Sequence, residues 1–171
     1  FLVLDYFTTP SVELFLRFAV YRAVCTGIVI VQYVVLRTTR PARGDFLHGY
    51  FFTIVVAGTI TLMTVDLGGF DSSYWAGLNL VIAANLLLPW SARHAFLNGT
   101  SIVLMYVAAN ALWGGPFHGE YLAQSLFFMG AMVVIGIVIS TSRFQLIVAE
   151  FQSRWDLQDA NASLERSRAE L

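Results

Sequence analysis

Long runs of apolar residues, separated by short polar connections, dominate the pattern of this chain. A membrane-spanning helix needs roughly 20 mostly apolar residues, and the pattern predicts such spans over 14–36, 46–65, 73–89, 94–113 and 120–140. The connections between them carry Gly, Pro, Asp and Ser, which are typical of turns and helix caps. The pattern therefore predicts an all-α fold, a polytopic membrane helix bundle with five visible spans.

The composition favours a membrane protein over a soluble domain. Hydrophobic residues make up 57% of the chain and charged residues 12%, whereas a soluble domain averages about 25% charged residues. The single Cys25 excludes a disulfide framework within the chain, and we interpret it as a packing residue. The chain opens at Phe1 without Met and without the pattern of a signal peptide, so we expect residues to be missing before it.

Five of the ten arginines mark one side of the predicted bundle. They occupy the first connection, the third connection and the end of the fifth span: Arg37, Arg40, Arg43, Arg93 and Arg143. The positive-inside rule places these ends, and with them the C-terminus, in the cytoplasm. The other two connections carry acidic residues and no Arg, so we expect them to face outward.

The first predicted span carries Arg17 and Arg22 in its outer third. Arg22 would lie roughly 12 Å inside the span, which is costly unless its side chain reaches the interface or is paired. Glu13 and Arg17, four residues apart, can pair on the helix surface. An interfacial helix over 11–22 is an alternative, but it leaves only about 14 apolar residues for a span. With the full span Phe1 lies outside, and a missing earlier span would give the parent protein six helices.

The fifth span is predicted to continue far beyond the membrane. No Pro lies between Tyr121 and Leu171, so we expect one helix of about 50 residues, roughly 75 Å long. Leu157, Leu164 and Leu171 recur every seven residues, which is the spacing of a coiled-coil seam. If these leucines are d positions, Asn161 falls at an a position, where a buried Asn sets the register at a cost in stability; if they are a positions, Ala160 and Ser167 take the d positions.

Two regions follow from this pattern. Residues 1–143 form a transmembrane sensor bundle, and residues 144–171 form a cytoplasmic signalling helix that pairs with a second copy as a parallel coiled coil. A solvated helical tail without a partner is the alternative. Gly136 and Ser140 have the small-residue spacing that lets a partner helix approach closely, either in a second copy or within one subunit.

The layout of short-looped membrane helices followed by LQDANASLERSRAEL resembles the sensor region and signalling-helix linker of bacterial sensor histidine kinases, including hybrid kinases. The segment SSYWAGLNLVIAANLLLPWSARH is similar to input domains of those kinases and to membrane anchors of class III adenylyl cyclases. The resemblance implies a homodimeric sensory domain in the bacterial inner membrane, with an output domain in the same parent chain. The kinase catalytic residues lie downstream of such a linker, so we expect no enzymatic activity in this chain and no nucleic-acid partner.

Polar residues near the outer ends of the predicted spans are the first candidates for a site. The amides of Asn79, Asn110 and Gln124 are expected at a similar depth on three helices, and Met63, Thr64 and Asp66 at the outer end of the second span can join them. Polar groups in hydrocarbon seek partners within the bundle. The six either form hydrogen bonds between helices or line a pocket for a small or lipophilic ligand.

His48 and His94 lie at the cytoplasmic ends of two predicted spans. Two imidazoles on facing helices would be axial ligands for a b-type haem, and the resemblance supplies a precedent, because some cyclase anchors hold two haems. Two haems need four histidines, whereas this chain has three, and His118 lies at the opposite side. We therefore favour no cofactor and no metal, with haem b as the alternative.

Overall fold

The computed structural model describes Asp5, Thr9 and the ranges 11–39, 46–84, 87–88 and 90–169, with side chains as far as Asn161. These residues are helical, without a strand among them: α2 (Val12–Thr38), α3 (Phe46–Asp66), α4 (Ala76–Ala84), α5 (Ala92–Trp113) and α6 (Gly119–Ala169). Two 3-10 turns, η1 (Gly69–Asp71) and η2 (Ser73–Trp75), precede α4. The all-α prediction is confirmed. Four helices, α2, α3, α5 and α6, are long and apolar enough to cross a membrane.

The third predicted span is shorter than the sequence pattern indicates. Helix was expected over 73–89, but the helical segment ends at Ala84, and Leu87 lies in a turn. The segment from Ser73 to Ala84 rises about 18 Å, little more than half of a hydrocarbon core of about 30 Å. Pro89 explains why the helix does not run on, because proline lacks an amide hydrogen and disfavours helix in the residue before it.

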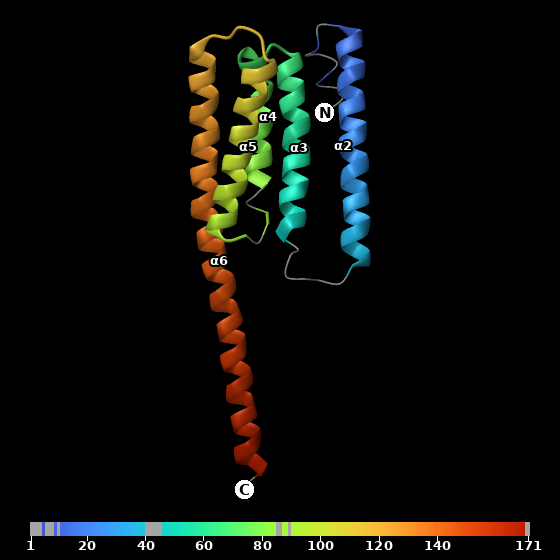
Figure 1. The fold of residues 1–171 in the computed structure, drawn as a ribbon. Coiled ribbons are helices and arrows are strands. Elements are labelled where there is room, and N and C mark those ends of the chain that lie inside the picture. Colours follow the sequence, from blue (N-terminus) through green and yellow to red (C-terminus); the bar gives the residue numbers. More distant parts are fainter. Residues whose placement is uncertain are drawn as a thin grey trace.

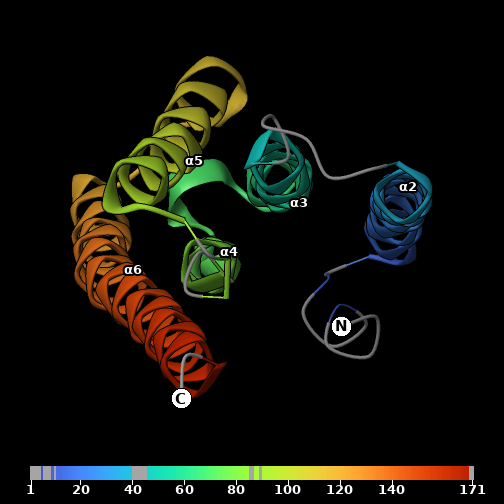
Figure 2. The ribbon, with the colours of Figure 1, turned by 90° about the horizontal axis from the view of Figure 1, so that it is seen from below.

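α3, α4, α5 and α6 pack around one core, whereas α2 lies beside α3 at the edge of the bundle (Figures 1 and 2). The core is built from fully buried side chains such as Leu78 of α4, Tyr106 of α5 and Met129 of α6. For helices in a membrane, close packing and hydrogen bonds, rather than the removal of water, supply the association, because lipid is as apolar as these side chains.

α5 and α6 approach each other closely at Gly99. A β-carbon at this position would lie 2.8 Å from Cγ2 of Val133, closer than side-chain carbons approach in folded proteins. Small residues at helix contacts in membranes allow this close approach. The same pair of helices buries Tyr106, whose hydroxyl lies 3.4 Å from Oγ of Ser125.

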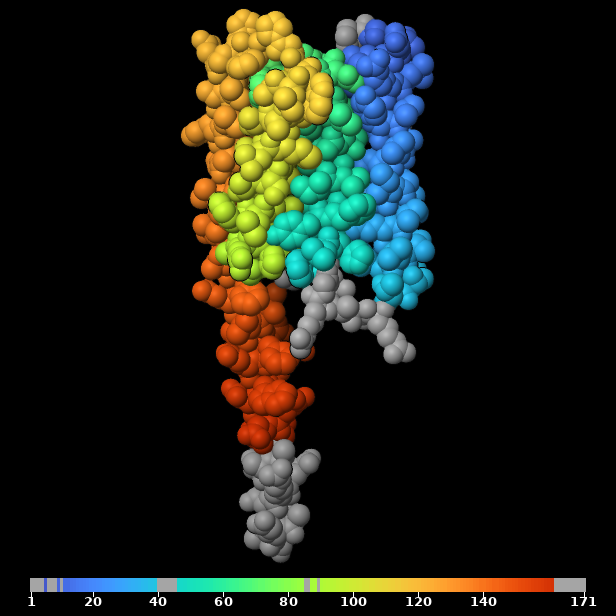
Figure 3. All heavy atoms as spheres, in the orientation of Figure 1, coloured from blue at the N-terminus to red at the C-terminus, as the bar shows by residue number. Residues whose placement is uncertain are grey.

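α6 is a single helix of 51 residues, about 77 Å long. Its buried positions continue only as far as Ser140, and every side chain from Phe144 to Asn161 is exposed. The helix leaves the bundle at the end that we call the inner end and continues alone (Figures 1 and 3). The prediction of one continuous helix is confirmed over the described residues; Leu171 lies outside them.

Candidate functional site

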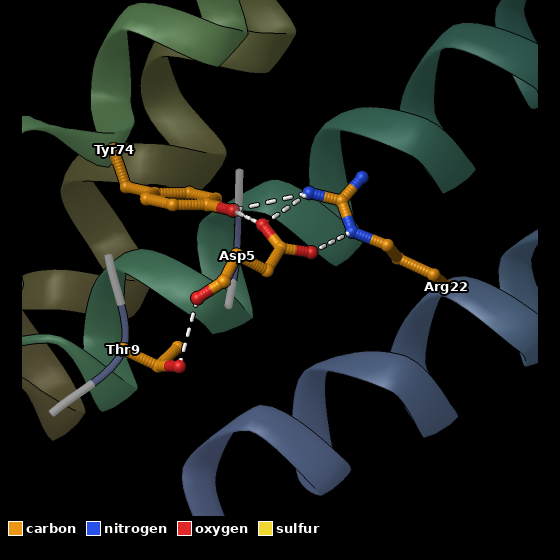
Figure 4. A network of polar contacts seen from close by, with 4 residues as sticks. All are labelled: Asp5, Thr9, Arg22 and Tyr74. Atoms are coloured by element: carbon orange, nitrogen blue, oxygen red, sulfur yellow. Dashed lines mark hydrogen bonds and ion pairs between the residues drawn. The ribbon is translucent and has the colours of Figure 1, made fainter. Parts of the chain in front are cut away.

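α2 is attached at the outer end of the bundle through Arg22 (Figure 4). Its Nε donates to Oδ2 of Asp5 at 2.5 Å, and its Nη2 donates to Oδ1 of Asp5 at 2.8 Å and to the hydroxyl of Tyr74 at 3.0 Å. The Tyr74 hydroxyl itself donates to the Asp5 carboxylate, which is fully buried. The arginine that lies deep in the predicted span is therefore paired, which offsets the cost of placing its charge there.

A second polar contact joins α2 to the outer end of α3. Arg17 lies 3.3 Å from Oδ1 of Asp66 and 3.9 Å from the carboxylate of Glu13, and the hydroxyl of Tyr21 donates to Oδ2 of Asp66 at 3.1 Å. The pairing of Glu13 with Arg17 is thus confirmed. Asp66, which we expected beside the buried amides, instead faces α2, because an arginine there offers an opposite charge.

Asn110 connects α5 to α3 within the core. Only 1% of its surface is exposed, and its Nδ2 donates to the carbonyl oxygen of Tyr106 at 2.8 Å and lies 3.4 Å from Oγ1 of Thr64. Its Oδ1 has no hydrogen-bond partner among the described residues. Met63, next to Thr64 in α3, is fully buried. Asn110 and Thr64 therefore form the hydrogen bond between helices that buried polar groups require.

The other two amides do not join this pair. Asn79 is half-buried on α4, and its enclosed Oδ1 has no hydrogen-bond partner within the described part of the chain. Gln124 is exposed on α6. Among the six candidate residues at the outer ends of the spans, the structure thus joins Asn110 to Thr64 by a hydrogen bond. Asp66 instead faces α2, and Gln124 is exposed on α6.

Aromatic rings surround His94 at the inner end of α3 and α5. The hydroxyl of Tyr50 donates to the His94 carbonyl oxygen at 3.0 Å and lies 3.2 Å from Nδ1 of the imidazole. The ring of Phe46 is 4.8 Å from that imidazole, and Trp90 stacks on Tyr50 with ring centres 4.9 Å apart. Gly49 makes room for this arrangement, because a β-carbon there would overlap the indole of Trp90.

His48 has different surroundings from His94. It lines two grooves between α2 and α3, and His94 lines neither of them. A haem with two axial histidines needs both imidazoles to face one cavity. The two grooves do not bring His48 and His94 together, and a haem held by these two histidines stays a prediction.

The two grooves were not found by sequence reasoning. One encloses about 500 Å³ and the other about 660 Å³, and Gln32 and His48 lie between them at the contact of α2 with α3. Gln32 is 8% exposed, and its Nε2 donates to the carbonyl oxygen of His48. Its signal in the sequence is a single amide within the apolar run GIVIVQYVVL, which marks a functional residue by default in a membrane span.

The two outer connections meet through Asp71 and His118. The His118 backbone N–H donates to Oδ1 of Asp71 at 2.9 Å, and the imidazole Nδ1 lies 2.8 Å from Oδ2. These hydrogen bonds, the backbone one first, hold the pKa of Asp71 below its usual value, because they stabilise the charged carboxylate. The turn that positions Asp71 passes through Gly68 and Gly69, whose φ angles of 102° and 68° favour glycine.

The residues proposed for pairing with a second copy lie along α6. Gly136 is buried, yet a β-carbon there would meet nothing within 4 Å, and the buried Oγ of Ser140 has no hydrogen-bond partner among the described residues. Leu157 is 62% exposed and Asn161 is also exposed. The side chain of Leu164 and all of Leu171 lie outside the described residues. The coiled-coil seam stays a prediction.

Comparisons of the chain with protein-family models, with curated proteins and with solved structures found no match. Two geometric features of the described residues bear on the function. One is the continuation of α6 beyond the bundle, and the other is the contact between α2 and α3 with its two grooves.

Proposed function

We propose that the chain is the membrane-embedded sensory input domain of a homodimeric receptor in the bacterial inner membrane. A stimulus changes the packing of the bundle, and α6 carries that change to a cytoplasmic histidine kinase in the same parent protein. The observation that supports this proposal is the uninterrupted course of α6 from the bundle into residues 144–169, which we call the α6 extension and whose side chains are exposed as far as Asn161. Because no turn interrupts the helix, a shift or rotation of α6 in the bundle also moves the extension.

The α6 extension exposes more large apolar side chains than a solvated helix needs. Phe144, Phe151 and Trp155 are 48%, 67% and 64% exposed. Together with Val148 they are spaced four, three and four residues apart, as in the seam of a coiled coil. A second copy of the same helix would cover this stripe, which supports a dimer.

The stripe formed by Phe144, Val148, Phe151 and Trp155 and the seam predicted from the leucines lie on different faces of α6. Leu157 follows Trp155 by two residues, which is about 200° around the helix. One straight partner helix cannot cover both faces at once, so the extension has two alternative ways to pair. Two packings of similar energy are what a signalling helix needs, because a stimulus can then shift their populations.

The stimulus in this proposal is a small or lipophilic ligand. On the outer side, Asn79 and Asn110 remain its candidate contacts, because their enclosed side-chain oxygens have no partner among the described residues. Asp66 is paired with Arg17, and Gln124 is exposed on α6. These two are therefore weaker candidates than the buried amides.

Insertions in the α6 extension of the parent receptor test the proposal. Two alanines inserted after Gln152 rotate the following seam by about 200°, whereas a second copy of residues 146–152 inserted at the same place keeps the heptad phase. Autophosphorylation from ATP is measured in membrane vesicles. We expect the seven-residue insertion to retain the basal rate and the two-residue insertion to change it.

Three results would count against parts of the proposal. Equal effects of the two insertions would exclude transmission through the phase of the helix. A parent protein that forms a cyclic nucleotide from ATP would replace the kinase with a cyclase, the second candidate output. Absence of both activities, with a monomeric parent in vesicles, would remove the receptor proposal.

A further inference from the structure

The smaller of the two grooves, which we call the inner groove, lies between α2, α3 and the segment that leads into α5. Its volume of about 500 Å³ is within the range of small-molecule sites, roughly 300–1,000 Å³. The lining is mainly apolar, and its polar or aromatic members are Gln32, Tyr33, Phe46, His48, Phe52 and Trp90. The larger groove, on the other side of the contact between α2 and α3, shares Gln32 and His48 but has neither Tyr33 nor Trp90.

Gln32 is unusual among the residues of α2. Only Phe18 and Gln32 are buried on this helix, so an amide takes one of its two enclosed positions. Nε2 of Gln32 is used by the carbonyl oxygen of His48, but Oε1 is buried and has no hydrogen-bond partner among the described residues. A buried acceptor without a donor is unfavourable. Because Gln32 lines the groove, a small rotation of its side-chain amide would present this oxygen to a donor placed there.

We propose that the inner groove binds a neutral lipophilic molecule with a hydroxyl group, which enters from the bilayer and donates a hydrogen bond to Oε1 of Gln32. The apolar lining matches the body of such a molecule, and the free acceptor matches its hydroxyl. A fatty-acid carboxylate fits less well, because an amide oxygen repels it and no arginine of the described residues lines the groove.

The route into the inner groove follows from the position of α2. This helix packs against α3 and leaves most of its surface to lipid, with side chains such as Ile30 and Val34 more than half exposed. A molecule dissolved in the bilayer can therefore reach the groove sideways, without crossing the polar contacts at the outer end. The hydroxyl would stop at Gln32, about 9 Å from the inner end of α2 at Thr38.

Photolabelling with a matched pair of probes tests this site. The purified chain in phospholipid nanodiscs is labelled with dodecanol that carries a diazirine in its chain, or with the methyl ether of the same probe, which has no donor. Labelled peptides are identified by mass spectrometry. We expect the alcohol to label residues of α2 and α3 around the groove, to be displaced by unlabelled dodecanol, and to label them more than the ether does.

Two substitutions connect the labelling to the groove. Gln32→Leu removes the acceptor and is expected to weaken the apparent affinity for the alcohol about fivefold, the effect of one lost hydrogen bond, with no effect on the ether. Val29→Trp fills the groove and is expected to reduce labelling by both probes. Gln124→Leu makes the same chemical change at an exposed position of α6 and is expected to change neither.

Several outcomes would overturn the site. Equal labelling by alcohol and ether, or unchanged affinity in Gln32→Leu, would show simple partition into the bilayer. Labelling only around Val24 and Gly27 would place the molecule in the larger groove instead. The melting temperature of each variant shows that it is folded. None of these measurements needs an output domain, so the site and the receptor proposal can fail independently.

Discussion

α2 and the four-helix core are held in place by different kinds of interaction. The core is packed by apolar side chains, and Gly99 allows α5 and α6 to approach closely. α2 buries Phe18 and one amide, and its polar contacts with its neighbours lie toward its two ends. The position of the core depends on many weak contacts, whereas the position of α2 depends on a few directional ones. α2 can therefore shift without dismantling the core.

Removal of a large core side chain should have the greatest effect. Tyr106 is fully buried and meets Phe70 edge to face with ring centres 5.5 Å apart. Tyr106→Ala leaves a cavity among α5, α6 and η1 and is expected to lower the free energy of unfolding by about 3–5 kcal/mol. Denaturation of the chain in detergent micelles, followed by circular dichroism, measures the loss.

The matched control for this change is Phe127→Ala, which shortens an aromatic side chain that is 71% exposed. It should leave the free energy of unfolding almost unchanged. If both variants lost the same stability, burial in the core would not explain the effect of Tyr106→Ala. The contrast between a core held by packing and an α2 held by polar contacts would then have no basis.

Loss of the buried ion pair should move α2 while the core stays folded. Arg22→Gln leaves the carboxylate of Asp5 buried without its cation, at a cost of about 3 kcal/mol. Spin labels on Cys25 of α2 and on an introduced Phe127→Cys of α6 report the distance between the two helices. We expect a longer and broader distance distribution in the variant, with little change in helical content.

Arg17→Gln is the companion change at the exposed pair. The Arg17 side chain is 51% exposed, and such pairs contribute about 0.5 kcal/mol. The distance distribution should stay close to that of the parent chain. An equal response to the two substitutions would mean that burial does not decide which arginine holds α2.

The smallest effect concerns the outer connections and depends on pH. Hydrogen bonds from His118 lower the pKa of Asp71 in the folded chain. This contact therefore contributes stability at pH values above the usual Asp pKa, and the contribution is lost as the pH falls through the lowered value. Asp71→Asn should reduce the melting temperature slightly at neutral pH and not at all in strong acid. A difference that persists unchanged in acid would contradict the role of the charge.

The helical layout could be predicted because apolar runs and their breaks are local properties of a chain. The span predicted from residue 46 does begin at Phe46, and the last helix begins at Gly119, one residue before its predicted start. α4 could not be delimited in the same way. Its apolar residues continue past Ala84. Apolar composition alone does not show at which residue a buried helix ends.

The candidate sites were harder to predict. The depth of a residue along a predicted span follows from counting residues, but the direction in which its side chain points around the helix does not. A helix that is apolar all round has no stripe to define which face turns inward. Asn110 faces the core and Gln124 faces outward for reasons of packing alone. The side chain of Asp66 turns toward α2 because it forms an ion pair with Arg17, a residue distant in the sequence. Gln32 was overlooked because only the tertiary contact with His48 shows that its oxygen is enclosed.

The length of α6 has a mechanical consequence. From Arg143 to Ala169 the helix rises about 40 Å, so it acts as a lever arm with its pivot at the inner end of the bundle. A tilt of about 5° at the pivot displaces the far end by about 3.5 Å, more than half of the 5.4 Å pitch of a helix. A change in bundle packing too small to alter any single contact by an ångström would thus become, at the far end, a movement large enough to exchange one set of side-chain contacts for the next.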